Sequence, residues 1–128
     1  MLNKIVLMGR LTKDPELRYT HTSSIPVAGF SLAVDRKIIK DRDKETDFFD
    51  IVAWQGTAEF VSKYFVKGQQ MCVEGRLQQR KWADSEGKTR YAYEVIAESV
   101  YFAGRKADGV QNGEADYSTD FDPFENAA

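Results

Sequence analysis

The sequence predicts an all-β fold: a small five-stranded barrel with one short helix between its third and fourth strands, followed by an acidic tail. Alternating apolar and polar residues recur between turn signals, which is typical of half-buried strands. Only one stretch, residues 57–66, has helical spacing. Charge also divides the chain, because residues 1–106 hold all 18 Lys and Arg with 14 acids, whereas residues 107–128 hold six acids and no base. A basic body with an acidic end therefore underlies the net charge of −2.

The first strand is predicted over residues 3–12, which are mostly β-branched and aliphatic. A segment this apolar is buried on both faces or covered by a partner. Gly9 inside it indicates a bend or bulge, as needed where a sheet curls. Pro15 lies in the turn that follows, and residues 17–20 form a short strand at most.

The second and third strands are predicted from clean alternation. In residues 26–34, the apolar face consists of Ala28, Phe30, Leu32 and Val34. A charged loop at residues 41–45 separates this strand from residues 46–54. The core face of the latter strand holds Phe49, Ile51 and Ala53. Both strands therefore have one side that faces a core.

The helix is predicted over residues 57–66, with Thr57 as its N-cap and Gly68 as its stop signal. Two strands follow, at residues 70–82 and 88–102. The core face of the first of them holds Met71, Val73 and Leu77. This order, five strands with a helix between the third and the fourth, is that of the five-stranded OB-fold barrel.

The domain is expected to cover residues 1–104, and residues 105–128 are expected to be a disordered acidic tail. The tail has too few apolar residues to offset the entropy of ordering it. Its last part contains two aromatics among acids: Phe121, Asp122, Pro123, Phe124 and Glu125. Composition leaves open whether this segment binds a partner or only adds solubility.

The remaining features of the composition exclude several classes of protein. No apolar run is long enough to span a membrane, and no leader precedes a cleavage site, so we expect no membrane association. The lone cysteine, Cys72, has no partner for an internal disulfide. We expect it to be a small buried hydrophobe in a reducing cytoplasm.

One predicted strand, residues 74–82, has an unusual face. Because successive side chains alternate, that face consists of Glu74, Arg76, Gln78, Arg80 and Trp82. Arg and Glu are rarely buried unpaired, so the face is outward and fits a phosphate chain beside an unpaired base. On the preceding strand, the same parity is shared by Phe48, Asp50, Val52 and Trp54. The alternative is an exposed Trp82 that covers a hydrophobic edge, with two ordinary core aromatics.

Two of these segments resemble a known family. Residues 9–20 resemble the motif that opens bacterial and phage-encoded single-stranded DNA-binding proteins, and residues 74–82 resemble their fourth-strand motif. The likeness extends over residues 1–102. It implies an OB fold, a homotetramer, and single-stranded DNA wrapped on a basic surface by aromatic stacking. It also implies work in DNA replication, recombination and repair in the cytoplasm (nucleoid), with replication and repair proteins recruited by the tail.

The resemblance assigns roles to particular residues. The stacking positions fall on Phe48, Trp54, Trp82 and, where the family has a further ring, the aliphatic Ile38. The candidates for phosphate contacts are Arg76, Arg80 and Lys81 first, then Lys4, Arg10, Arg18, Arg36, Lys37, Lys63 and Arg90. Asp50 stands where the family often has a base. The tail also differs from the family's usual C-terminus, because four residues follow Phe124 where the family ends in Pro-Phe.

Catalysis is not expected. The only histidine, His21, lies in a polar loop, and one His with one Cys cannot supply a usual zinc site. We therefore predict no enzyme and no cofactor. Two alternatives remain open: an OB-fold primosome or RNA-binding adaptor, and a metal-dependent nuclease that uses Asp47, Asp50 and Glu74.

Overall fold

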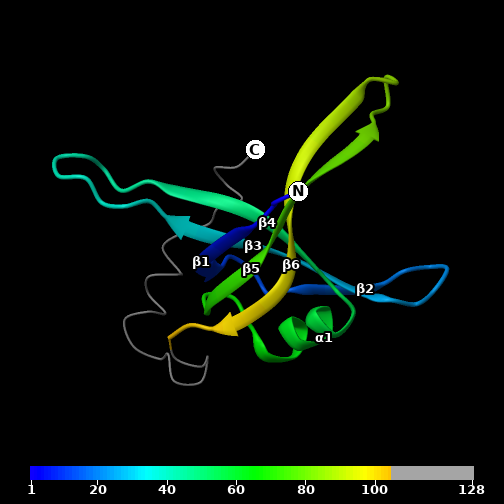
Figure 1. The fold of residues 1–128 in the computed structure, drawn as a ribbon, viewed down its shortest axis with the longest axis horizontal. Coiled ribbons are helices and arrows are strands. Elements are labelled where there is room, and N and C mark those ends of the chain that lie inside the picture. The colour runs from blue at the N-terminus through cyan, green and yellow to red at the C-terminus, as the bar shows by residue number, and fades with distance from the viewer. Residues whose placement is uncertain (105–128) are drawn as a thin grey trace.

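The computed structural model describes residues 1–104, and the predicted disorder of the tail lies outside this range. The chain forms six strands and one helix (Figure 1). In order, they are β1 (Ile5–Leu11), β2 (Glu16–Tyr19), β3 (Pro26–Asp35), β4 (Thr46–Trp54), α1 (Gln55–Tyr64), β5 (Gln70–Ala83) and β6 (Thr89–Phe102). Apart from the short β2, these are the predicted five strands with one helix between the third and fourth, so the predicted fold class is confirmed.

Five of the strands pair in a closed ring. β1 pairs with β5, β5 with β6, β6 with β4, β4 with β3, and β3 again with β1. All pairs are antiparallel except β4–β6. β2 adds to the free side of β3, at the position of the predicted short strand.

Gly9 lies where the ring closes. The last two residues of β1 pair with β3, where Arg10 opposes Ala33. A Cβ atom on Gly9 would overlap the carbonyl oxygen of Ala33 and lie 2.9 Å from a methyl group of Val34. The glycine thus serves a close approach between two backbones, rather than the bulge that was one of its predicted roles.

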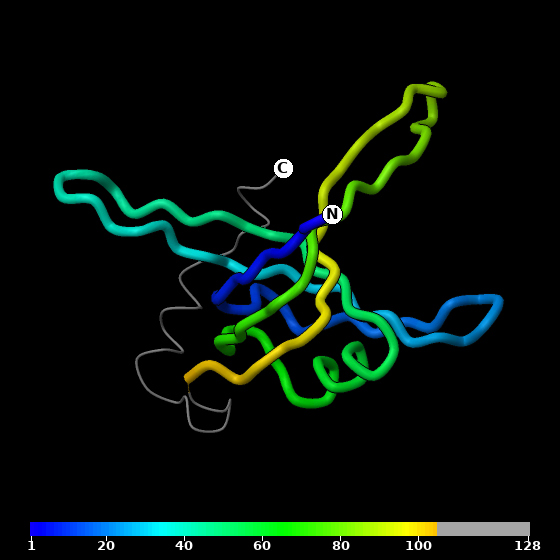
Figure 2. Tube along the Cα trace, viewed as in Figure 1, coloured from blue at the N-terminus to red at the C-terminus, as the bar shows by residue number. Residues whose placement is uncertain are grey.

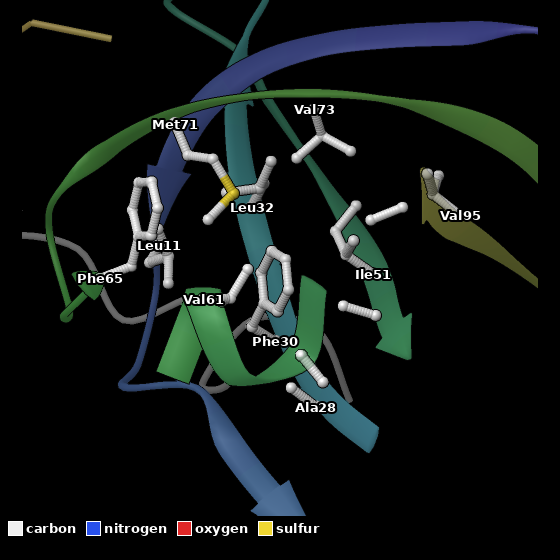
Figure 3. Packing of buried hydrophobic residues seen from close by; sticks show 13 residues of the cluster. Leu11, Ala28, Phe30, Leu32, Ile51, Val61, Phe65, Met71, Val73 and Val95 are labelled. Carbon is white, nitrogen blue, oxygen red and sulfur yellow. The ribbon is translucent and has the colours of Figure 1, made fainter. Parts of the chain in front are cut away.

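The core fills the inside of the ring and is covered by α1 (Figure 3). The predicted alternation of β3 and β4 is confirmed: Ala28, Phe30 and Leu32 are buried, as are Ile51 and Ala53. Burial of each large apolar side chain stabilises the fold by about 1.5–3 kcal/mol. The other large members of the core are Leu11, Val61, Phe65, Met71, Val73 and Val95.

The predicted bounds of the helix are wrong by two residues at each end. α1 starts at Gln55, directly after β4, so Trp54 and not Thr57 occupies the N-cap position, without a side-chain cap. Gln55 has a φ of 55°, which turns the chain at once from strand into helix. Gly68, with a φ of 86°, lies beyond the helix and donates its N–H to the Leu11 carbonyl.

Three hairpins extend outward from the ring, as Figures 1 and 2 show for β2–β3, β3–β4 and β5–β6. Between Leu77 and Glu94, β5 and β6 pair only with each other; we call residues 77–94 the arm. Leu77 was predicted to face the core but is 41% exposed, because β5 has left the ring there. Asn3 holds the base of the arm through two hydrogen bonds to the Leu77 backbone, of 2.8 and 3.0 Å.

Two further expectations concern burial and membranes. Cys72 is only half-buried, since it lies on the outer side of β5 opposite Tyr101 and not in the core. Within residues 1–104, no helix combines the length and the apolarity needed to cross a membrane.

Candidate nucleic-acid interface

The outer side of β4 carries two of the predicted stacking residues. Because Ile51 and Ala53 point into the core, their neighbours in sequence point outward. Trp54 is 44% exposed at the end of the strand, and Phe48 is half-buried nearer its start. Across the sheet, Trp54 opposes Val27 and Phe48 opposes Ala33. The Trp54 side chain is thus the more accessible of the two.

The outer side of β5 carries the third ring. Trp82 is 42% exposed, and the guanidinium of Arg80 lies 4.9 Å from the centre of its indole ring. The register relates this side to β4, because Ile96 of β6 pairs with Val52 on one side and Arg76 on the other. The rings of β4 and β5 therefore belong to one outward surface of the sheet, with β6 between them.

A shallow depression lies on the same surface, next to Trp54. Its volume is about 290 Å³. It is lined by Glu16, Arg18, Val27, Gly29 and Val52. Gly29 leaves this space open, because nothing lies within 4 Å of the position its Cβ would take.

Most of the predicted phosphate-binding cations already have carboxylate partners. The observed pairs are Lys4–Glu74 (2.9 Å), Arg18–Glu16, Arg36–Asp47 (2.9 Å), Arg76–Glu98 (3.3 Å), Arg80–Glu94 (3.9 Å) and Arg90–Asp84 (2.8 Å). Exposed pairs of this kind contribute about 0–1 kcal/mol. A phosphate can therefore replace the carboxylate at little cost.

The pKa shifts follow these pairs. A hydrogen bond from Arg36 holds the pKa of Asp47 below its ordinary value, and the pKa of Arg36 is raised in turn. The pKa of Asp84 is lowered first by Arg90 and then by the backbone N–H of Lys88. Asp84 thus organises the turn at the end of the arm in its ionised form. The pKa of Lys4 is raised, chiefly by its hydrogen bond to Glu74.

The other predicted cations differ in their surroundings. Arg10 is half-buried and donates a 3.0 Å hydrogen bond to the Gly68 carbonyl, which is a structural role. Within residues 1–104, Lys37, Lys63 and Lys81 have no carboxylate within ion-pair distance. Lys63 lies 5.3 Å from the ring centre of Tyr64. Among the predicted cations, these three lysines are the ones most readily available to a phosphate.

Two predicted positions lie apart from the others. Ile38 is 77% exposed in the β3–β4 hairpin loop, beside Ile39, which is 55% exposed and which the sequence reasoning did not select. Asp50 points outward opposite Ser31. Among the described residues it forms no ion pair with Arg76 or Arg80, whose partners are other carboxylates. The tail residues Phe121–Glu125 lie outside the described range.

The sequence reasoning missed two tyrosines on the arm. Tyr91 and Tyr93 are 56% and 61% exposed. They pair across the arm with Lys81 and Gln79, so they lie on the opposite face from Trp82. The alternation of residues 89–95 places both tyrosines on one face, but it was used only to predict a strand. Lys81 lies on this second face, apart from Arg76 and Arg80.

The residues proposed for a nuclease are not brought together. Asp47 is held by Arg36, and Glu74 by Lys4. Within residues 1–104, no three His, Cys, Asp or Glu side chains form a group suited to a metal ion. The geometry therefore gives the nuclease hypothesis no support.

A closed ring of strands whose outer surface combines exposed rings with cations defines a class: the OB-fold proteins that bind single-stranded nucleic acids. The model of the single-strand binding protein family matches residues 2–103. The chain is 48% identical over 101 residues to single-stranded DNA-binding protein 3 of Clostridium acetobutylicum, which covers 79% of this chain and 70% of the relative. It is 44% identical over 115 residues to the single-stranded DNA-binding protein of Oceanobacillus iheyensis, covering 89% and 70%. The chain belongs to the single-strand binding protein family.

Proposed function

We propose that this protein binds single-stranded DNA without choice of sequence and protects it. The observation that carries the proposal is the exposure of Trp54 and Trp82 on one outer surface, beside cations, in a chain of this family. An exposed π face accepts any base, because every base has one. Phe48 and Ile38 would extend the contact along β4 and its hairpin.

The affinity would come from two sources. Stacking contributes about 1–3 kcal/mol per base. Phosphate contacts add a part that depends on salt, since log K falls by about 0.7 per contact for each unit of log salt concentration. Lys37, Lys63 and Lys81 would make contacts directly, and the arginines would do so by exchanging a carboxylate for a phosphate.

A fluorescence titration tests the proposal. Oligo-dT added to the protein should quench the emission of its two tryptophans, and the affinity should fall when salt is raised. RNA of equal length serves as competitor. Absence of quenching would contradict the stacking model, and equal competition by RNA would favour the alternative of an RNA-binding or primosome adaptor.

Assembly into a homotetramer is part of the proposal. The outer side of β1 exposes Val6 and Met8, and the register continues this apolar strip through Cys72 to the exposed Tyr101. β1 also pairs with β3 only over its last two residues, so the preceding part has an open edge. An apolar strip beside an open edge favours association with other copies.

Membership of the family supports a proposal for the cellular role. We propose action in replication, recombination and repair, in the nucleoid of the cytoplasm. Residues 1–104 would be the DNA-binding domain. Residues 105–128 would recruit replication and repair proteins through their acidic and aromatic end.

Deleting residues 107–128 should leave the affinity for oligo-dT equal or higher. The deletion removes six negative charges and no positive ones, and these acids compete with the DNA for the cationic surface. The titration above, repeated at low salt where the difference is largest, measures the effect. A clear loss of affinity would show that the tail itself takes part in DNA binding.

A further inference from the structure

The arm has a second face, of which the proposed DNA surface uses only Lys81. On this face, Tyr91 lies opposite Lys81, and Tyr93 lies opposite Gln79. Both rings are more than half exposed, and within residues 1–104 the arm pairs with no other strand there. Figures 1 and 2 show the arm extending away from the ring. These tyrosines therefore add little to the core.

The two rings are nevertheless held by polar contacts. The amide of Gln79 donates a 3.1 Å hydrogen bond to the hydroxyl of Tyr93. The ammonium of Lys81 lies 5.8 Å from the centre of the Tyr91 ring. Residues two apart on a strand are separated by about 7 Å, so each ring has room for a base of its own.

The charge of this face favours a polyanion. Its seven exposed positions contain one cation and no acid: Leu77, Gln79, Lys81, Ala83, Thr89, Tyr91 and Tyr93. The opposite face differs, because Arg80 and Arg90 have carboxylate partners. Lys81 has none within residues 1–104.

We propose that the second face of the arm is a further binding site for single-stranded DNA, in which bases stack on Tyr91 and Tyr93 and a phosphate contacts Lys81. The inference rests on the proposed function. Single-stranded DNA bound at Trp82 needs to pass only around the edge of the two-stranded arm to reach these rings. The arm is thus held by DNA on both of its faces.

A second copy of the chain is a poorer occupant of this face. Protein interfaces are depleted of lysine at their centres. If the same face of a second copy docked here, it would bring a second Lys81 and no acid to compensate either charge. DNA supplies the missing negative charge together with flat groups for both rings.

The test uses the full chain with Tyr91→Ala and Tyr93→Ala combined, and the double phenylalanine variant as matched control. Titration with poly-dT under stoichiometric conditions gives the number of nucleotides occluded per chain. We expect that number to fall in the alanine variant, with affinity for long oligo-dT reduced about five-fold or more per ring. Tryptophan quenching at saturation should stay unchanged, and the phenylalanine variant should match the wild type.

Lys81→Gln gives an independent measurement. The slope of log K against log salt should decrease in magnitude by about 0.7. Photocrosslinking of the wild type to bromouracil-substituted oligonucleotide should label Tyr91 or Tyr93, and this result does not depend on the folding of any variant.

The outcomes separate the hypotheses. Unchanged occlusion and affinity in the alanine variant, without crosslinks to either tyrosine, would overturn the second site. A smaller assembly in light scattering with unchanged occlusion would assign the face to a second copy and also overturn it. If the wild type itself failed to bind oligo-dT, the proposed function would fall instead.

Discussion

Replacing Trp54 and Trp82 together by alanine should weaken binding of a long oligo-dT by about 2–6 kcal/mol, which is about 30-fold or more. Each indole is exposed on the outer surface, so its removal takes away a stacking platform and little of the core. Because the variant has no tryptophan left, its affinity is measured by the anisotropy of a fluorescently labelled oligonucleotide.

The matched control replaces both tryptophans by phenylalanine. This variant keeps a ring at each position and should lose much less affinity. Thermal unfolding of all three proteins shows whether the fold is intact. An alanine variant that binds as tightly as the wild type would mean that the bases contact some other part of the surface.

Gly9→Ala should lower the free energy of unfolding by about 1–3 kcal/mol, the usual cost of overpacking. The added methyl group would overlap the Ala33 carbonyl oxygen, and the nearest alternative space is occupied by Val34. β1 and β3 must therefore move apart where they close the ring. Urea unfolding followed by circular dichroism measures the change.

Gly29→Ala is the control for this effect. Gly29 is also a strand glycine, but its methyl group would meet nothing within 4 Å. Its stability should be unchanged or slightly raised, because alanine loses less entropy on folding. If Gly9→Ala unfolded at the same urea concentration as the wild type, the ring would not be tightly closed at Gly9.

The ring strands and their core faces could be predicted from the sequence because strand alternation is a local signal. Phe30 and Ile51, for example, are buried as the alternation with their sequence neighbours predicted. The same parity failed for Leu77, since alternation does not reveal where a strand leaves the ring. The prediction of the helix bounds was wrong because Gln55 turns the chain with a positive φ, which the residue type glutamine does not indicate.

The site was predicted in part, for a related reason. The rings of Trp54 and Trp82 were placed outward by parity, and they are exposed. The carboxylate partners of the cations were not predicted, because Glu98 reaches Arg76 across 22 positions of sequence, through the pairing of β5 and β6. These ion pairs show which cations already have a carboxylate partner, and only the folded register reveals them.

The arm has a consequence for the energetics of binding. An isolated two-stranded ribbon is only marginally stable in water, and beyond Leu77 β5 and β6 have no third strand beside them. A ligand that stacks on such a ribbon must first stiffen it, and part of the gain from each contact is used in doing so. Affinity measured at equilibrium would then understate how strongly each ring of the arm holds its base.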